Sequence, residues 1–152
     1  MHLDHSRMAA YEKGGGVCFK ESKGVLMKSR QVTQYICEFC NKRTYTKQSM
    51  ANHEANCTMN PNRGCRMCLK GLAEGGDMSR LLPLMPDPIW NDSGDLENLA
   101  QINEAIEKVR KECGDCPACI LATLRQKRIP SYPTDFNYKY ECERFWKEYN
   151  DN

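Results

Sequence analysis

The chain has 152 residues, of which 40% are hydrophobic and 28% are charged, and its mean hydropathy is −0.72. This length allows one compact domain or two small modules with modest cores, and the formal net charge of +2 gives no general argument for nucleic-acid binding. The ten cysteines come without a signal-peptide pattern or a membrane-spanning apolar run, so we expect an intracellular, cytoplasmic protein whose thiols bind metal rather than form disulfides.

Residues 1–33 are predicted to form a basic, flexible arm. Three glycines at positions 14–16 and a short supply of apolar side chains favour a mobile segment or a weak hairpin over a packed element. Such an arm could contact phosphates, or it could be a solvated tail. Its basic side chains towards the next segment are Lys20, Lys23, Lys28 and Arg30.

Residues 34–58 carry the most specific motif, Tyr35-x-Cys37-x2-Cys40-x12-His53-x3-Cys57. A Cys-x2-Cys turn directs both sulfurs to one point, and an imidazole and a thiol four residues apart on a helix share a face. Together they offer Zn²⁺ a closed set of four ligands. A closed set has no position for a reacting water, so the motif predicts a folding staple and not a hydrolytic centre.

This segment resembles a C2H2-type zinc finger in its Cys-Cys-His-Cys variant, which implies a ββα fold. The family places an aromatic residue four positions after the second cysteine, whereas here Thr44 stands there with Tyr45 beside it. The resemblance also implies which side chains would contact nucleic acid. Base contacts would come from Thr46, Ser49 and Asn52, and backbone contacts from Lys42, Arg43 and Lys47.

A second knuckle, Cys65-x2-Cys68, has no nearby partner, and the next cysteines are Cys113, Cys116 and Cys119. One four-cysteine zinc site would use both groups, with either Cys113 and Cys116 or Cys116 and Cys119 as the second pair. Gly114 is placed to stop a helix that ends at Cys113, whereas Pro117 and a following helix favour a thiolate at Cys119. We therefore predict a second Zn²⁺ on Cys65, Cys68, Cys116 and Cys119. Cys18, Cys113 and Cys142 have no assigned role.

Residues 59–152 are predicted to form a helical module around that site. Apolar residues at helical spacing predict helices over 95–113, 118–127 and 136–149. The aromatic residues of the last helix are expected to lie in the core. The overall prediction is a small zinc-stabilised α+β protein, in which a ββα-like finger precedes a mainly helical module.

Charge is unevenly distributed along the chain. Residues 19–73 hold ten Lys and Arg against three acids, and residues 74–115 hold four against ten. The basic half contains the finger, which favours a non-catalytic, nucleic-acid-binding protein; the acidic half favours the alternative, a protein-binding adaptor or inhibitor. Enzymatic activity is not expected, because no open metal site or phosphate loop is evident.

More loosely, the small size, the lone finger and the run from Cys116 to Gln126 resemble uncharacterised small zinc proteins carried by bacteriophages. That resemblance implies a host cytoplasm as the setting. A host or defence protein would then be the partner in the adaptor alternative. No membrane or small-molecule partner is predicted.

Overall fold

The computed structural model describes residues 30–71 and 76–151, with no side-chain description at 70 and 71. The chain divides into a unit of Met1–Gln31 and a unit of Val32–Asn152. Most of the arm predicted for residues 1–33, including Lys20, Lys23 and Lys28, therefore lies outside the described residues, as does Cys18. The described part is a small α+β structure with one two-stranded sheet and six α-helices.

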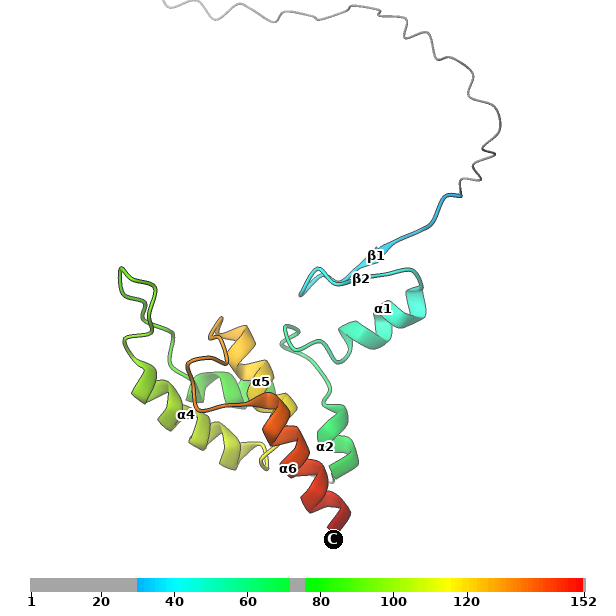
Figure 1. The fold of residues 1–152 in the computed structure, drawn as a ribbon. Coiled ribbons are helices and arrows are strands. Elements are labelled where there is room, and N and C mark those ends of the chain that lie inside the picture. Colours follow the sequence, from blue (N-terminus) through cyan, green and yellow to red (C-terminus); the bar gives the residue numbers. More distant parts are fainter. Residues whose placement is uncertain (1–29, 72–75, 152) are drawn as a thin grey trace, which may run out of the picture. The chain divides into compact units, whose positions relative to one another are not determined.

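The first compact region is a hairpin beside a helix (Figure 1). Strand β1 (Tyr35–Ile36) pairs antiparallel with β2 (Arg43–Thr44), and α1 (Lys47–Glu54) follows directly. The small core consists of Cys37, Met50 and Cys57, with Tyr35 and Met59 packed against it. Tyr45, which follows Thr44, is 67% exposed. It therefore does not supply the aromatic residue that C2H2-type fingers carry four positions after the second cysteine.

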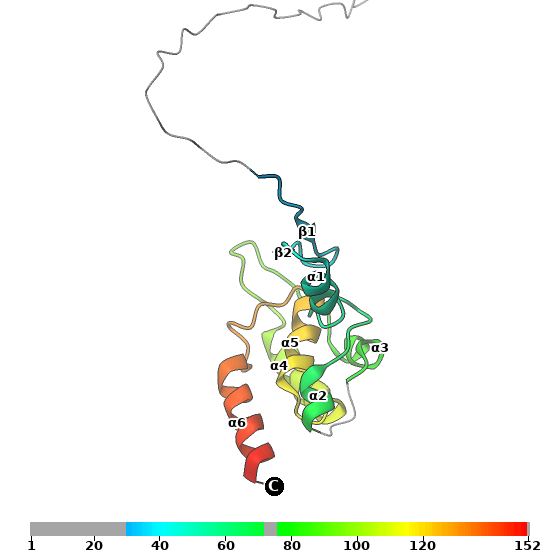
Figure 2. The ribbon, with the colours of Figure 1, turned by 90° about the vertical axis from the view of Figure 1, so that its right-hand side faces the viewer.

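The remaining helices surround α5, which runs from Pro117 to Gln126 and lies between α4 and α6 (Figures 1 and 2). Ile120, Ala122 and Leu124 on this helix are fully buried. The other elements of this region, in chain order, are α2 (Arg66–Gly71), α3 (Met78–Leu81), the 3-10 turn η1 (Leu82–Leu84), α4 (Leu99–Glu112) and α6 (Tyr138–Asp151). One apolar core therefore joins segments from Cys65 to Phe136.

Helix α4 ends where the sequence predicts and begins later. Cys113 is its C-cap, and Gly114 follows with a φ of 60°, the left-handed conformation that glycine adopts readily. Residues 95–98, predicted as its first turn, belong to the preceding loop. The reason is that the Asn98 side chain donates to Asp87 O and accepts from Ile89 N, both at 2.9 Å. These bonds hold residues 87–98 in a non-helical conformation.

The prediction that the aromatic residues of the last helix lie in the core is wrong for Tyr140 and Tyr149. Phe136 is buried but precedes α6, whereas Tyr140 and Tyr149 are 63% and 46% exposed. The buried face of α6 centres on Glu141, which pairs with Arg110 of α4. An ion pair therefore joins the buried side of α6 to α4, while Phe145 and Trp146 are half-buried and stack edge to face on the same helix.

The hairpin with α1 and the later helices are joined by a hydrogen-bonded turn. The Gln126 amide donates to Thr58 O at 3.0 Å and to Asn60 O at 3.1 Å. The Asn60 amide in turn donates to Glu54 O at 2.8 Å, at the end of α1. The turn that follows α1 is thus bonded to both α1 and α5.

Candidate metal centres

The first group of candidate ligands consists of Cys37, Cys40, His53 and Cys57, whose ligand atoms all lie within 4.8 Å of one another. The hairpin turn supplies the first two, α1 supplies His53, and Cys57 follows α1 in a turn closed by its N–H bond to Glu54 O. Cys40 Sγ lies 3.1 Å from His53 Nε2. A tetrahedral zinc separates such atoms by about 3.6–3.8 Å, so the Cys40–His53 pair would open by about 0.5 Å around the ion. The four donors, three thiols and one imidazole, are the set that a structural zinc uses.

Backbone N–H groups at the first group favour the thiolate form that a metal needs. Burial raises the pKa of the Cys37 thiol, but hydrogen bonds from the N–H groups of Cys40 and Phe39 outweigh it and hold this pKa below its ordinary value. Burial raises the pKa of Cys57 to about 11. A bound cation would favour ionisation of both thiols.

The second group consists of Cys65, Cys68, Cys116 and Cys119, all of them buried. Cys65 Sγ lies 3.5 Å from Cys116 Sγ, and Cys68 Sγ lies 3.5 Å from Cys119 Sγ. These separations are close to the edge of a ZnS4 tetrahedron, about 3.8 Å. The two pairs have the same local design, because each first cysteine directly precedes a helix and each second cysteine lies in its first turn.

Mutual hydrogen bonding dominates the electrostatics of the second group. Hydrogen bonds from Cys116, Cys119 and Cys68 lower the pKa of the Cys65 thiol. Those from Cys119, Cys65 and Cys68 raise the pKa of Cys116. The pKa of Cys68 is lowered to about 7, mainly by hydrogen bonds to Cys116 and Cys119. The four thiols are thus close enough to share protons through hydrogen bonds. A divalent cation at their centre would replace those protons and favour the thiolate forms.

Cys113 lies outside the second group, although the sequence left it open as a ligand. It is fully buried, and burial raises the pKa of its thiol to about 12. Its Sγ donates weakly to Arg110 O and Cys116 O, both at 3.8 Å. Cys113 is therefore a neutral core side chain, while Cys142 is half-buried on α6.

Two residues beside the second group were not predicted from the sequence. Arg63 Nη1 lies 3.5 Å from Ala118 O and 3.9 Å from Cys119 Sγ, which places a positive charge next to the sulfurs. Gly76 packs against the same cysteine, and its N–H hydrogen-bonds the Cys68 thiol. In the sequence, the glycine pair at 75 and 76 is the only indication that the backbone packs closely against Cys119.

Replacing Gly76 by alanine should weaken metal binding at the second group. The added Cβ would lie 2.7 Å from Leu81 Cδ1, 3.0 Å from Cys113 Cβ and 3.1 Å from Cys119 Sγ. The Leu81 side chain would have to move, and the ligand Cys119 would have to shift slightly as well. We expect a loss of about 1–3 kcal/mol in unfolding free energy and faster zinc transfer to a competing chelator. Gly64→Ala is the matched control, because its Cβ would meet only Ala55 O at 3.7 Å. Equal zinc transfer rates for the two variants would contradict the close packing.

The side chains predicted to contact nucleic acid are all exposed, but two of them are engaged with each other. Thr46 caps α1: its Oγ1 accepts from Ser49 N at 3.2 Å and donates to Ser49 Oγ at 2.7 Å. Asn52 Oδ1 accepts from Gln48 Nε2 at 3.2 Å. Lys42, Arg43 and Lys47 are exposed at the hairpin and at the start of α1.

Comparison with known proteins gave no match: no family model, no curated protein and no solved structure aligns with the chain. The assignment of the two metal centres therefore rests on their geometry and donor chemistry. Among the described helices, none combines the length and apolar character needed to cross a bilayer.

Proposed function

We propose that the chain is a non-catalytic protein that binds two structural Zn²⁺ ions and contacts nucleic acid through a finger of the Cys-Cys-His-Cys type. Cys37, Cys40, His53 and Cys57 would hold one ion, and the four buried cysteines the other. Each zinc would supply a charged centre that fixes its ligands. Four protein ligands leave no position for a reacting water, which is why the proposed role is binding.

The observation that carries the nucleic-acid proposal is the state of the basic side chains. In the helical region, Arg80, Lys108, Arg110, Lys127 and Arg144 pair with carboxylates. Exposed cations for which the described part of this region records no ion pair, such as Lys111, Lys139 and Lys147, are spread over α4 and α6. Within the described residues no ion pair is recorded for Lys42, Arg43 or Lys47, which lie within six positions of one another and are exposed. These cations are available to phosphates.

The test is the salt dependence of binding. Phosphate contacts release counterions, so log K should fall linearly with log salt, with a slope of about −0.7 to −0.9 per contact. The triple variant Lys42→Gln, Arg43→Gln, Lys47→Gln should flatten the slope by about 2 to 3. Fluorescence anisotropy with labelled oligonucleotides measures both.

The matched control removes three exposed cations from the helices, with Lys111→Gln, Lys139→Gln and Lys147→Gln. It changes the net charge equally and should leave the slope unaltered. Equal loss in both triple variants would mean that only net charge matters. Absence of binding at low salt would overturn the proposal.

A protein partner is the second candidate, favoured by exposed apolar side chains in the helical region. Leu69 is 78% exposed, Ile89 53% and Trp90 47%. A packed protein interface would lose little affinity with added salt, in contrast to phosphate binding.

A further inference from the structure

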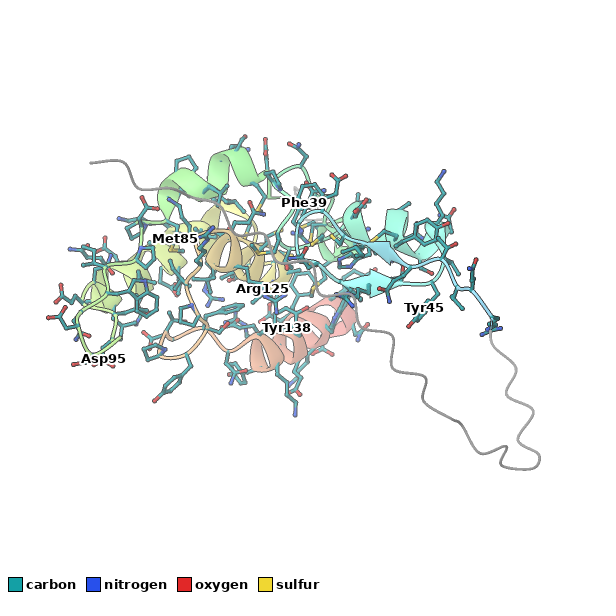
Figure 3. All side chains as sticks on the ribbon, turned by 90° about the horizontal axis from the view of Figure 1, so that it is seen from above. Phe39, Tyr45, Met85, Asp95, Arg125 and Tyr138 are labelled. Atoms are coloured by element: carbon teal, nitrogen blue, oxygen red, sulfur yellow. The ribbon has the colours of Figure 1, made fainter. Side chains whose placement is uncertain are left out.

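The outer face of the hairpin is both aromatic and basic. In the β-ladder Ile36 is opposite Arg43, so these two side chains share one face, and Tyr35 and Thr44 share the other. The exposed fractions of the side chains follow the same alternation. Tyr35 and Thr44 are partly buried, whereas Ile36 and Tyr45 are 51% and 67% exposed. Figure 3 shows Tyr45 projecting outward from the finger.

Charge distinguishes this face from the neighbouring hollow between β1 and α1. That hollow, of about 280 Å³, is bordered by Ile36 and Lys47, which it shares with the hairpin face, and by the carboxylates of Glu38 and Glu54. The hairpin face adds Arg43 in place of these carboxylates, with Lys42 adjacent to it in the sequence. A polyanion is therefore favoured across the hairpin face and disfavoured in the hollow.

Helix α1 is poorly suited to read the edges of paired bases. Thr46 and Ser49 satisfy each other at the N-cap, and Asn52 accepts from Gln48. A base that contacts the hairpin face would meet the ring of Tyr45 and the apolar Ile36 instead. Such flat and apolar groups bind the faces of bases, which are accessible in single strands and covered in a duplex.

We propose that the hairpin face, formed by Ile36, Arg43 and Tyr45 and flanked in the sequence by Lys42 and Lys47, binds single-stranded nucleic acid. A base stacks on Tyr45 beside Ile36, and the flanking cations contact the phosphates on either side. The inference rests on the proposed nucleic-acid binding and names the form of the ligand, an unpaired strand of DNA or RNA.

The experiment uses the zinc-loaded full chain with three labelled probes: a mixed-sequence DNA strand, the matching RNA strand, and the DNA duplex of the same sequence. We expect at least one single strand to bind about tenfold more tightly than the duplex. Tyr45→Ala should weaken single-strand binding by about 5- to 150-fold, the range for loss of one base–aromatic stack. Tyr45→Phe should retain most of the affinity.

Tyr140→Ala is the matched control, since Tyr140 is 63% exposed but lies on α6. It should leave the affinity unchanged, and zinc content verifies that each variant folds. Comparison of the DNA and RNA strands identifies the source of the unpaired bases. Preference for duplex, or equal affinity for wild type and Tyr45→Ala, would overturn the inference while leaving nucleic-acid binding intact. No binding to any probe would overturn both.

Discussion

Replacing Cys116 by alanine should lower the zinc content from two ions to one per chain and unfold most of the helical region. Cys116 is fully buried, caps α5, and contacts Cys65, which lies 51 positions earlier in the chain. Apparent binding free energies of structural zinc are about 10–16 kcal/mol, as large as the whole stability of a domain of this size. Elemental analysis and hydrogen exchange of residues 60–151 would measure both effects.

Two further cysteine variants make this prediction specific. Cys113→Ala removes an equally buried thiol three positions away, outside the ligand group, and should keep two zincs at a cost of about 0.5–3 kcal/mol. Cys57→Ala should release the other zinc and expose mainly residues 35–57 to exchange. Metal loss in Cys113→Ala, or identical exchange patterns in Cys57→Ala and Cys116→Ala, would contradict two separate centres.

Replacing Glu141 by alanine should destabilise the helical region by about 1.5–3 kcal/mol, the usual contribution of hydrogen bonds to a charged group. Glu141 Oε2 and Oε1 accept from the Arg110 guanidinium at 2.9 and 3.0 Å, and only 7% of the Glu141 side chain is exposed. Arg110 would keep Asp115 and Glu107 as partners. Chemical unfolding, followed by circular dichroism, measures the loss.

The same pair predicts a pH dependence. Hydrogen bonds from Arg110 hold the pKa of Glu141 below its ordinary value, despite burial. The folded state therefore binds its proton less readily than the unfolded state, whose glutamate pKa is about 4.3. The stabilisation is complete above that pH and is lost as the pH falls through the folded-state pKa.

The measurement is the difference in unfolding free energy between wild type and Glu141→Gln, because the zinc thiolates of both proteins also protonate in acid. This difference should be constant near neutral pH and shrink below about pH 4.3. A difference that grows in acid would exclude the ion pair as its source. Lys147→Gln, an exposed change on the same helix, should show no such difference.

The features that the sequence predicts well are local. The spacing from Cys37 to Cys57 constrains four ligands within one short hairpin and helix, so the first group follows from covalent geometry and helix periodicity. Pro117 and Gly114 likewise mark the start of α5 and the end of α4, because each acts on its own backbone. The first turn of α4 was overestimated, since Asn98 bonds to residues far back in the preceding loop.

The sequence by itself thus determined both cysteine knuckles, the ligand types and, to within one residue, the end of α4 and both ends of α5, since these depend on neighbours along the chain. The sequence predicted Cys65, Cys68, Cys116 and Cys119 as one group but left Cys113 open, and the tertiary structure placed Cys113 outside it. Only the tertiary structure decided that Gly76 packs against Cys119 and that Arg110 of α4 pairs with Glu141 of α6. It also turned Tyr45 outward from the small core of Cys37, Met50 and Cys57. Such contacts depend on how distant segments pack, and no local spacing or propensity encodes that choice.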